Sequence, residues 1–199
     1  RDFGNEADSK IQNFALEIFN DDDLYKKYKE IDISNADKES IEFHKDLGTD
    51  FKNAGHGLSN ESRNRLIEID KKLIELGISY SENIAKDKTE LKFSEAELNG
   101  LSKNELNNLK KDEEKFIITM AYPDVNAVSE NCNVRSTREK VWKAFNNRAV
   151  KDNIPILKEA VLLRNEKSKL FGFETWAEYR LQNRICLLYT SDAADDLLC

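Results

Sequence analysis

The chain has 199 residues, of which 39% are hydrophobic and 35% charged, a balance typical of a soluble globular protein and not of a disordered one. Its formal net charge of −7 disfavours nucleic acids and anionic membranes as partners, and no run of about 18 apolar residues could span a bilayer. Only seven glycines and two prolines interrupt it, so most of the chain can be helical.

Three amphipathic helices are predicted before Gly55. Apolar residues at helical spacing predict the first over 6–19, and the acidic run 20–23 is expected to end it and to cap the short helix that follows. A calcium loop is the alternative for this run, but the alternating ligands, central Gly and final Glu of an EF-hand are absent. A third helix is predicted over 37–53, with Gly55 as its stop signal.

The longest periodic element is predicted over 59–88. Apolar residues there form two stripes, the first of Leu66, Ile69, Leu73, Leu76 and Tyr80 and the second of Ile67, Ile74 and Ile78. A helix that is apolar on two stripes is expected to be covered on two sides. A coiled-coil dimer is the alternative, but the stretch is short for one standing alone.

Short helices and one strand-like run are predicted next. Ser94 with Glu97, and Ser102 with Glu105, have the spacing of a capping box. Residues 115–120 are β-branched enough to predict an edge strand or small hairpin, and the charged run 110–115 is expected to be a solvated loop.

Three further helix starts are predicted within 136–185. Capping-box spacing recurs at Ser136 with Glu139 and at Thr175 with Glu178, and Pro155 is expected in the first turn of the middle helix. Lys167 is the one break in the apolar stripe of that helix. The predicted fold class is therefore mainly all-α, a multi-helix array with long amphipathic helices and at most one small β-hairpin.

The same stretch carries a specific wording. Residues 137–148 read T-R-E-K-V-W-K-A-F-N-N-R, and 153–179 read N-I-P-I-L-K-E-A-V-L-L-R-N-E-K-S-K-L-F-G-F-E-T-W-A-E-Y. This resembles the thimet-oligopeptidase family of zinc metallopeptidases, which includes neurolysin, saccharolysin, oligopeptidase A and bacterial dipeptidyl carboxypeptidases. The resemblance covers about residues 60–185, although Ser168 stands where the family more often has Ala and Ser102 where it usually has Pro.

The resemblance implies that residues 1–185 are the N-terminal helical region of such an oligopeptidase. In that family this region is a wall of a deep channel that admits short peptides and faces a catalytic half, which would be a partner absent from this chain. The family's cofactor is zinc, and a cytoplasmic location is expected. The resemblance ends after Ile185, and residues 186–199 are expected to be a non-native, adapter-like tail.

No catalytic or metal-binding residue is predicted in the chain itself, and its substrate-binding residues are unassigned. A zinc peptidase of this kind needs two histidines one helical turn apart with a Glu between them, as in H-E-x-x-H. His44 and His56 lie twelve residues apart, and neither is followed by Glu. His44 is expected at the edge of a core and His56 in an exposed turn, while Cys132 is expected to be an unpaired buried thiol.

The predicted function is thus the channel-wall part of a zinc-dependent oligopeptidase that hydrolyses short peptides, with this chain inactive by itself. The alternative is a free-standing helical protein-interaction module without catalytic activity. That alternative explains the amphipathic helices equally well, but not the wording of residues 137–179. If the chain is part of an oligopeptidase, apolar helix faces that the catalytic half would cover are expected to be exposed in the isolated chain, whereas a free-standing module would not expose them.

Overall fold

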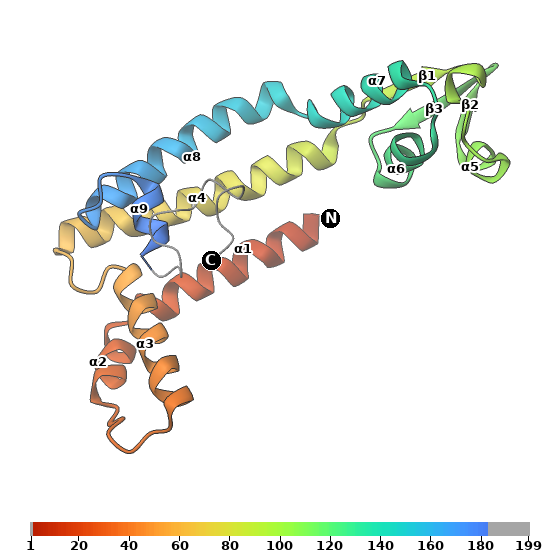
Figure 1. Ribbon diagram of the computed structural model, residues 1–199. Coiled ribbons are helices and arrows are strands. Elements are labelled where there is room, and N and C mark those ends of the chain that lie inside the picture. The colour runs from red at the N-terminus through yellow and green to blue at the C-terminus, as the bar shows by residue number, and fades with distance from the viewer. Residues whose placement is uncertain (1, 183–199) are drawn as a thin grey trace. The chain divides into compact units, whose positions relative to one another are not determined.

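The computed structural model describes residues 2–182, and helices dominate this part of the chain (Figure 1). The helices are α1 (Asp2–Phe19), α2 (Asp22–Glu30), α3 (Lys38–Asn53), α4 (Asn60–Lys86), α5 (Lys103–Asn108), α6 (Tyr122–Asn131), α7 (Arg135–Asn146), α8 (Val150–Leu170) and α9 (Trp176–Leu181). A 3-10 helix, η1 (Ala96–Leu98), and three strands, β1 (Glu90–Phe93), β2 (Lys110–Asp112) and β3 (Lys115–Thr119), complete them. The mainly all-α class is confirmed. The tail predicted at 186–199 lies outside the described residues.

The described residues form two compact units, residues 2–78 with 156–182 and residues 79–155. In the first unit, the acidic run acts as a helix cap, as predicted. Asp21 accepts hydrogen bonds from the N–H groups of Asp23 and Leu24 at the start of α2, and Asp37 accepts one from Ser40 at the start of α3. These carboxylates satisfy donors that the first helical turn leaves without partners.

Helix α4 is the longest described element, as predicted, and α8 is its partner in the first unit. Leu66, Ile69 and Leu76 of its first stripe are buried. The helices are antiparallel, because Arg65 Nε lies 2.6 Å from Glu166 Oε1 and Lys72 Nζ lies 3.8 Å from Glu159 Oε1. Such exposed ion pairs contribute about 1 kcal/mol or less each, so the buried apolar stripe supplies most of the stability.

The second unit contains a small antiparallel sheet with the strand order β1-β3-β2. Strand β3 confirms the predicted strand, but the solvated loop expected at 110–115 is wrong. Lys110–Asp112 instead forms the edge strand β2, whose side chains are nevertheless exposed. Backbone pairing needs no apolar side chain, and lysines are common on sheet edges. Strand β1, which the sequence did not predict, adds a third strand to the expected hairpin by pairing from Glu90 opposite Thr119 to Phe93 opposite Phe116.

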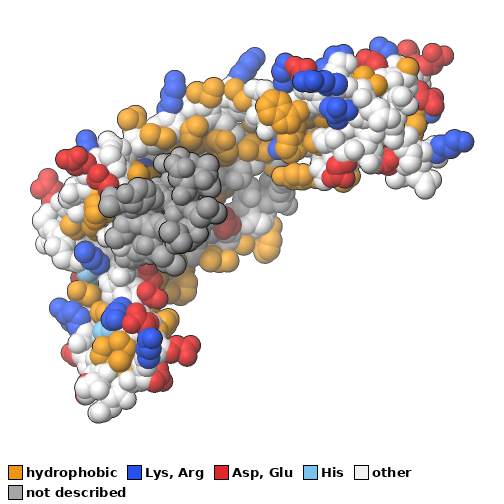
Figure 2. All heavy atoms as spheres, in the orientation of Figure 1, with side chains coloured by type: hydrophobic (Ala, Val, Ile, Leu, Met, Phe, Trp, Pro, Cys, Tyr) orange, Lys and Arg blue, Asp and Glu red, His pale blue; other side chains and the backbone are white. Residues whose placement is uncertain are grey.

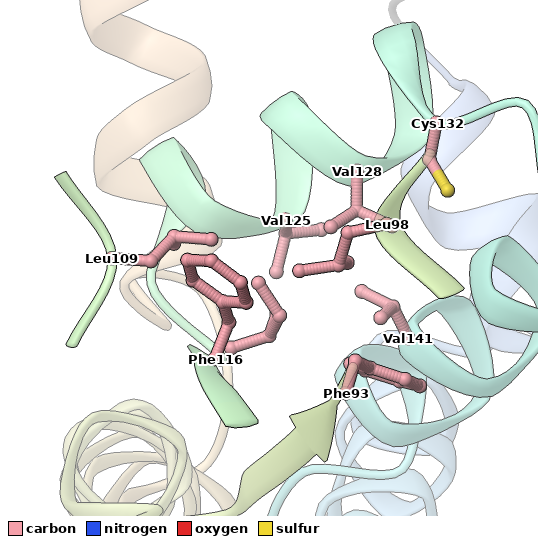
Figure 3. Close-up of a cluster of buried hydrophobic side chains, with 9 residues drawn as sticks. Phe93, Leu98, Leu109, Phe116, Val125, Val128, Cys132 and Val141 are labelled. Carbon is pink, nitrogen blue, oxygen red and sulfur yellow. The ribbon is translucent and has the colours of Figure 1, made fainter. Parts of the chain in front are cut away.

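A hydrophobic cluster joins this sheet to α6 and α7 (Figure 3). It consists of Phe93, Leu98, Leu109, Phe116, Ile118, Val125, Val128, Cys132 and Val141. Cys132 is a buried free thiol, as predicted, and its Sγ lies 3.4 Å from the Glu97 carbonyl oxygen.

Two of the predicted capping boxes, Ser102 with Glu105 and Thr175 with Glu178, are confirmed. The reciprocal bonds of Ser94 and Glu97 are also present, where they lead into η1. The box predicted at Ser136 and Glu139 is wrong, because α7 begins earlier, with Val134 as N-cap and no side-chain cap. Tertiary contacts set that start. The Thr137 hydroxyl donates to the Glu97 carbonyl oxygen over 2.8 Å, and the Asn133 backbone N–H donates to the Asn99 carbonyl oxygen over 2.7 Å.

The position predicted for Pro155 is wrong too. Helix α8 begins at Val150, so Pro155 lies inside it and not in its first turn. Two hydrogen bonds within the second unit stabilise the residues that precede the proline. The Asp87 carboxylate accepts from Ala149 N–H over 3.0 Å, and the Asn153 amide donates to the Tyr80 carbonyl over 3.1 Å. These contacts extend the helix beyond the start that a proline by itself favours.

Candidate functional site

The two histidines considered as metal ligands belong to an aromatic cluster in the first unit. His44 is half-buried and stacks on Tyr28 with ring centroids 4.4 Å apart, which confirms its predicted place at the edge of a core. His56 lies in a turn but is only 8% exposed, so the exposed position predicted for it is wrong. The ring centroids of His56 and Tyr25 are 4.0 Å apart, and His56 Nε2 lies 2.9 Å from the Phe19 carbonyl oxygen. These two contacts offset the free-energy cost of burying a polar ring.

These residues do not fit a zinc site. Across residues 2–182, no three His, Cys, Asp or Glu side chains are placed to hold a metal ion together. A hydrolytic zinc needs three protein ligands and an open position for water. His44 and His56 stack on different tyrosines, and neither belongs to a group of possible ligands within the described residues, so neither is assigned as a ligand.

Electrostatics around His56 favour its neutral form. Burial lowers its pKa below the ordinary value of 6.5, and the nearby Arg63 charge lowers it further, against the Phe19 carbonyl and Asp22, which raise it. Asp22 Oδ1 lies 3.6 Å from His56 Nδ1 but only 2.7 Å from Arg63 Nη1. The Asp22 carboxylate therefore interacts mainly with the Arg63 guanidinium and stabilises a protonated His56 only weakly. At neutral pH the ring is therefore uncharged and donates from Nε2 to Phe19.

The first unit is accordingly expected to lose stability as the pH falls. Because the folded-state pKa of His56 is depressed, its stabilising contribution is present above pH 6.5 and is lost as the pH falls through the folded-state pKa. Urea unfolding followed by Trp176 fluorescence in a Trp142→Phe background should show a midpoint that declines between about pH 7.5 and 5. His56→Gln should flatten this decline and His44→Gln should retain it. A level midpoint in the unsubstituted background would contradict the assignment.

A buried ion pair joins α4 to α8. Lys167 Nζ lies 2.5 Å from Asp70 Oδ1, and the two side chains are only 13% and 12% exposed. This pair explains the break that Lys167 makes in the apolar stripe of α8. Burial raises the pKa of Asp70, and the Lys167 charge opposes that shift without cancelling it.

Tyr179 of α9 lies close to this pair. Burial, with the Asp70 charge as a smaller cause, raises the pKa of Tyr179 to about 12, so the phenol stays neutral and donates to Asn53 Oδ1 over 3.1 Å. A groove of about 400 Å³ in the first unit includes Asn53, Asp70 and Lys167 in its lining, together with apolar residues of α1. Asp70 and Lys167 neutralise each other, which leaves Asp50 as the one charged lining residue outside that pair, and we assign this groove a structural role.

A second groove, of about 390 Å³, lies between α6 and α7 in the second unit. It is lined by Ser129, Arg135, Arg138, Glu139 and Trp142. The indole of Trp142 is 61% exposed, and Figure 2 shows Lys and Arg side chains beside exposed hydrophobic ones on the part of the molecule that carries α7. The spacing R-x-x-R-x-x-x-W places both arginines and the tryptophan on one face of a helix, although none of the three was predicted as a site residue.

Comparison with known proteins identifies the class to which this architecture is related. Residues 128–190, which begin in α6, match the sequence model described as Peptidase family M3. The resemblance predicted from residues 137–179 is thereby confirmed.

Individual relatives give the same result over most of the chain. It is 35% identical over 193 residues to the thimet-like oligopeptidase of Dictyostelium discoideum and 31% identical over 186 residues to the probable thimet oligopeptidase of Arabidopsis thaliana. It is also 27% identical over 198 residues to oligopeptidase A of Salmonella typhimurium. These alignments cover 90%, 90% and 88% of this chain but only 28%, 26% and 29% of the relatives. The chain thus spans somewhat more than a quarter of the length of the relatives it matches.

Proposed function

We propose that this chain is the N-terminal, channel-wall part of a zinc-dependent oligopeptidase that hydrolyses short peptides, and that it is inactive by itself. The observation that carries the proposal is its similarity to several oligopeptidases along about 90% of its length. On this proposal, residues 1–185 are the helical region of the enzyme, and residues 186–199 are a non-native tail, although the family match extends to residue 190. Short peptides and the catalytic half of the enzyme are the partners, and the cytoplasm is its location.

The zinc ligands would then come from the part of the enzyme that this chain does not include. When bound, the zinc ion would act as a Lewis acid and supply an activated water. The helices of this chain would limit which peptides reach the metal without touching it. No helix within residues 2–182 is long and apolar enough to cross a membrane.

Exposed apolar side chains support the proposal that another part of the enzyme covers these helices. Phe14 of α1 is 62% exposed and Leu162 of α8 is 69% exposed, and hydrophobic side chains are visible on several helices in Figure 2. Large apolar side chains that remain in water are typical of surfaces that another domain or subunit covers. The catalytic half is the cover that the proposed function provides.

Sequencing the source gene beyond Ile185 tests the proposal. We expect an open reading frame that continues into a second half with H-E-x-x-H on a helix and a further Glu as third ligand. The full-length enzyme should cleave a quenched peptide of about ten residues, and phenanthroline should inhibit it by removing the metal. A clean genomic frame that stops after Cys199, with no such motif, would leave the free-standing helical module as the function.

A further inference from the structure

We infer that the groove between α6 and α7 binds the carboxylate of a peptide, with Arg135 and Arg138 as its anion-binding residues and Trp142 as an apolar platform beside them. The inference rests on the proposed function, because it takes the ligand to be a peptide. We call this site the Arg–Trp groove, defined by Ser129, Arg135, Arg138, Glu139 and Trp142.

The charges of the groove are not balanced from within. Arg135 has no ion pair or side-chain hydrogen bond to any residue that the structure describes. Arg138 Nη1 donates a hydrogen bond to the Cys132 carbonyl oxygen, 2.5 Å away. This bond orients the guanidinium group, but a neutral carbonyl leaves its charge uncompensated. Glu139 is the only acid lining the groove, and its Oε1 lies 2.5 Å from Lys143 Nζ. Two guanidinium charges therefore remain for an external anion.

The position of these arginines strengthens the case for an anion. Arg135 is the first residue of α7, a helix of 12 residues whose first turn contains no acid and whose N-cap, Val134, has no side-chain acceptor. The positive end of a helix dipole disfavours cations, so a cation here raises the local potential and is not stabilised by the helix. Guanidinium groups suit carboxylates in particular, because their planar fork can donate two parallel hydrogen bonds.

Trp142 indicates what accompanies the carboxylate. It lies seven residues after Arg135, about 10 Å along the helix, which an extended peptide spans with about three residues. A peptide whose carboxylate lies at Arg135 can therefore place a neighbouring apolar side chain on the indole. The carboxylate has two possible sources, the C-terminus of the peptide or an acidic side chain within it.

Trp142 also makes the binding measurable. In the 199-residue chain carrying Trp176→Phe, Trp142 is the only tryptophan. We would titrate this protein with acetyl-Ala-Ala-Leu as the free acid, with its C-terminal amide, and with acetyl-Ala-Glu-Leu amide. The free acid should change the Trp142 fluorescence saturably and bind at least about tenfold more tightly than the uncharged amide, because a charge-assisted bidentate contact is lost in the amide.

Substitutions separate the groove from general charge effects. Arg135→Gln should weaken binding of the acid by about tenfold or more, since it removes one of two guanidinium groups. Lys103→Gln removes one positive charge from the first turn of α5 in the same unit and should leave the affinity within about twofold. Arg138→Lys keeps a charge near the Cys132 carbonyl, and should weaken binding while the urea midpoint stays unchanged.

The outcomes decide the inference. Tight binding of the Glu-containing amide supports it and assigns the carboxylate to a side chain, whereas binding of the free acid alone assigns it to the C-terminus. Equal affinities for acid and uncharged amide, no saturable signal with either acidic peptide, or an unchanged affinity in Arg135→Gln would overturn it. None of these measurements needs the catalytic half, so a failure here would not overturn the oligopeptidase proposal, and a failure of that proposal would not alter the measured affinities.

Discussion

Lys167→Met is expected to lower the free energy of unfolding of the first unit by about 3–5 kcal/mol, because it leaves the Asp70 carboxylate buried without its partner. Asp70 is 12% exposed, and Lys167 supplies the one ion pair found for it within residues 2–182. Urea unfolding at pH 7, followed by Trp176 fluorescence in a Trp142→Phe background, measures the loss. The loss should become smaller at lower pH, since a buried carboxylate without a partner takes up a proton.

Two controls distinguish the buried pair from an ordinary ion pair. The double variant Asp70→Leu with Lys167→Met should recover most of the stability, because a well-packed apolar pair can replace a buried ion pair. Lys72→Met removes the exposed contact with Glu159 between the same two helices and should cost about 1 kcal/mol or less. A loss of under about 1 kcal/mol in Lys167→Met would show that the pair contributes no more than a surface contact does.

Gly100→Ala is expected to destabilise the second unit by about 2–4 kcal/mol. Gly100 has a φ of +111°, and a Cβ there would collide with the Asn131 carbonyl oxygen and lie 2.8 Å from Asn133 N. Both are backbone atoms, which cannot rotate away as the end of a flexible side chain can. Urea unfolding followed by Trp142 fluorescence in a Trp176→Phe background reports on this unit.

Gly77→Ala is the matched control for this substitution. Gly77 lies inside α4, and a Cβ there would have no heavy atom within 4 Å. The same change of residue should therefore stabilise the first unit by about 1 kcal/mol, because alanine is the better helix former. Similar effects of the two substitutions would contradict the close backbone approach at Gly100.

Much of the helical architecture could be predicted from the sequence, because the interactions that define it are local. The caps at Asp21, Ser102 and Thr175 form as predicted, since each joins groups two or three residues apart. The periodicity of residues 59–88 predicts α4 for the same reason, because a helix repeats its buried face every three or four residues. The family resemblance is also a property of the sequence, because it rests on the order of residues and not on their contacts.

The candidate sites depended on contacts between distant residues. Lys167 is only a break in an apolar stripe until Asp70, 97 residues earlier, lies beside it. His56 looks exposed in the sequence because its neighbours are glycines, and it is buried because Phe19 and Tyr25 cover it from other helices. Neither partner lies within the few residues over which a sequence pattern is informative.

The capping box that does not form at Ser136 shows that long-range contacts can override a local sequence pattern. The spacing of Ser136 and Glu139 matches that of Thr175 and Glu178, yet only the second pair caps a helix. The start of α7 is decided instead by Thr137, which bonds the Glu97 carbonyl 40 residues away. The sequence by itself determined most of the helical segments, because these depend on hydrogen bonds and apolar spacing within a few residues, but it did not predict α6. The tertiary structure decided where α7 begins and which charged groups are paired or free, because burial and long-range contacts change the free energy of each group only after the chain has folded.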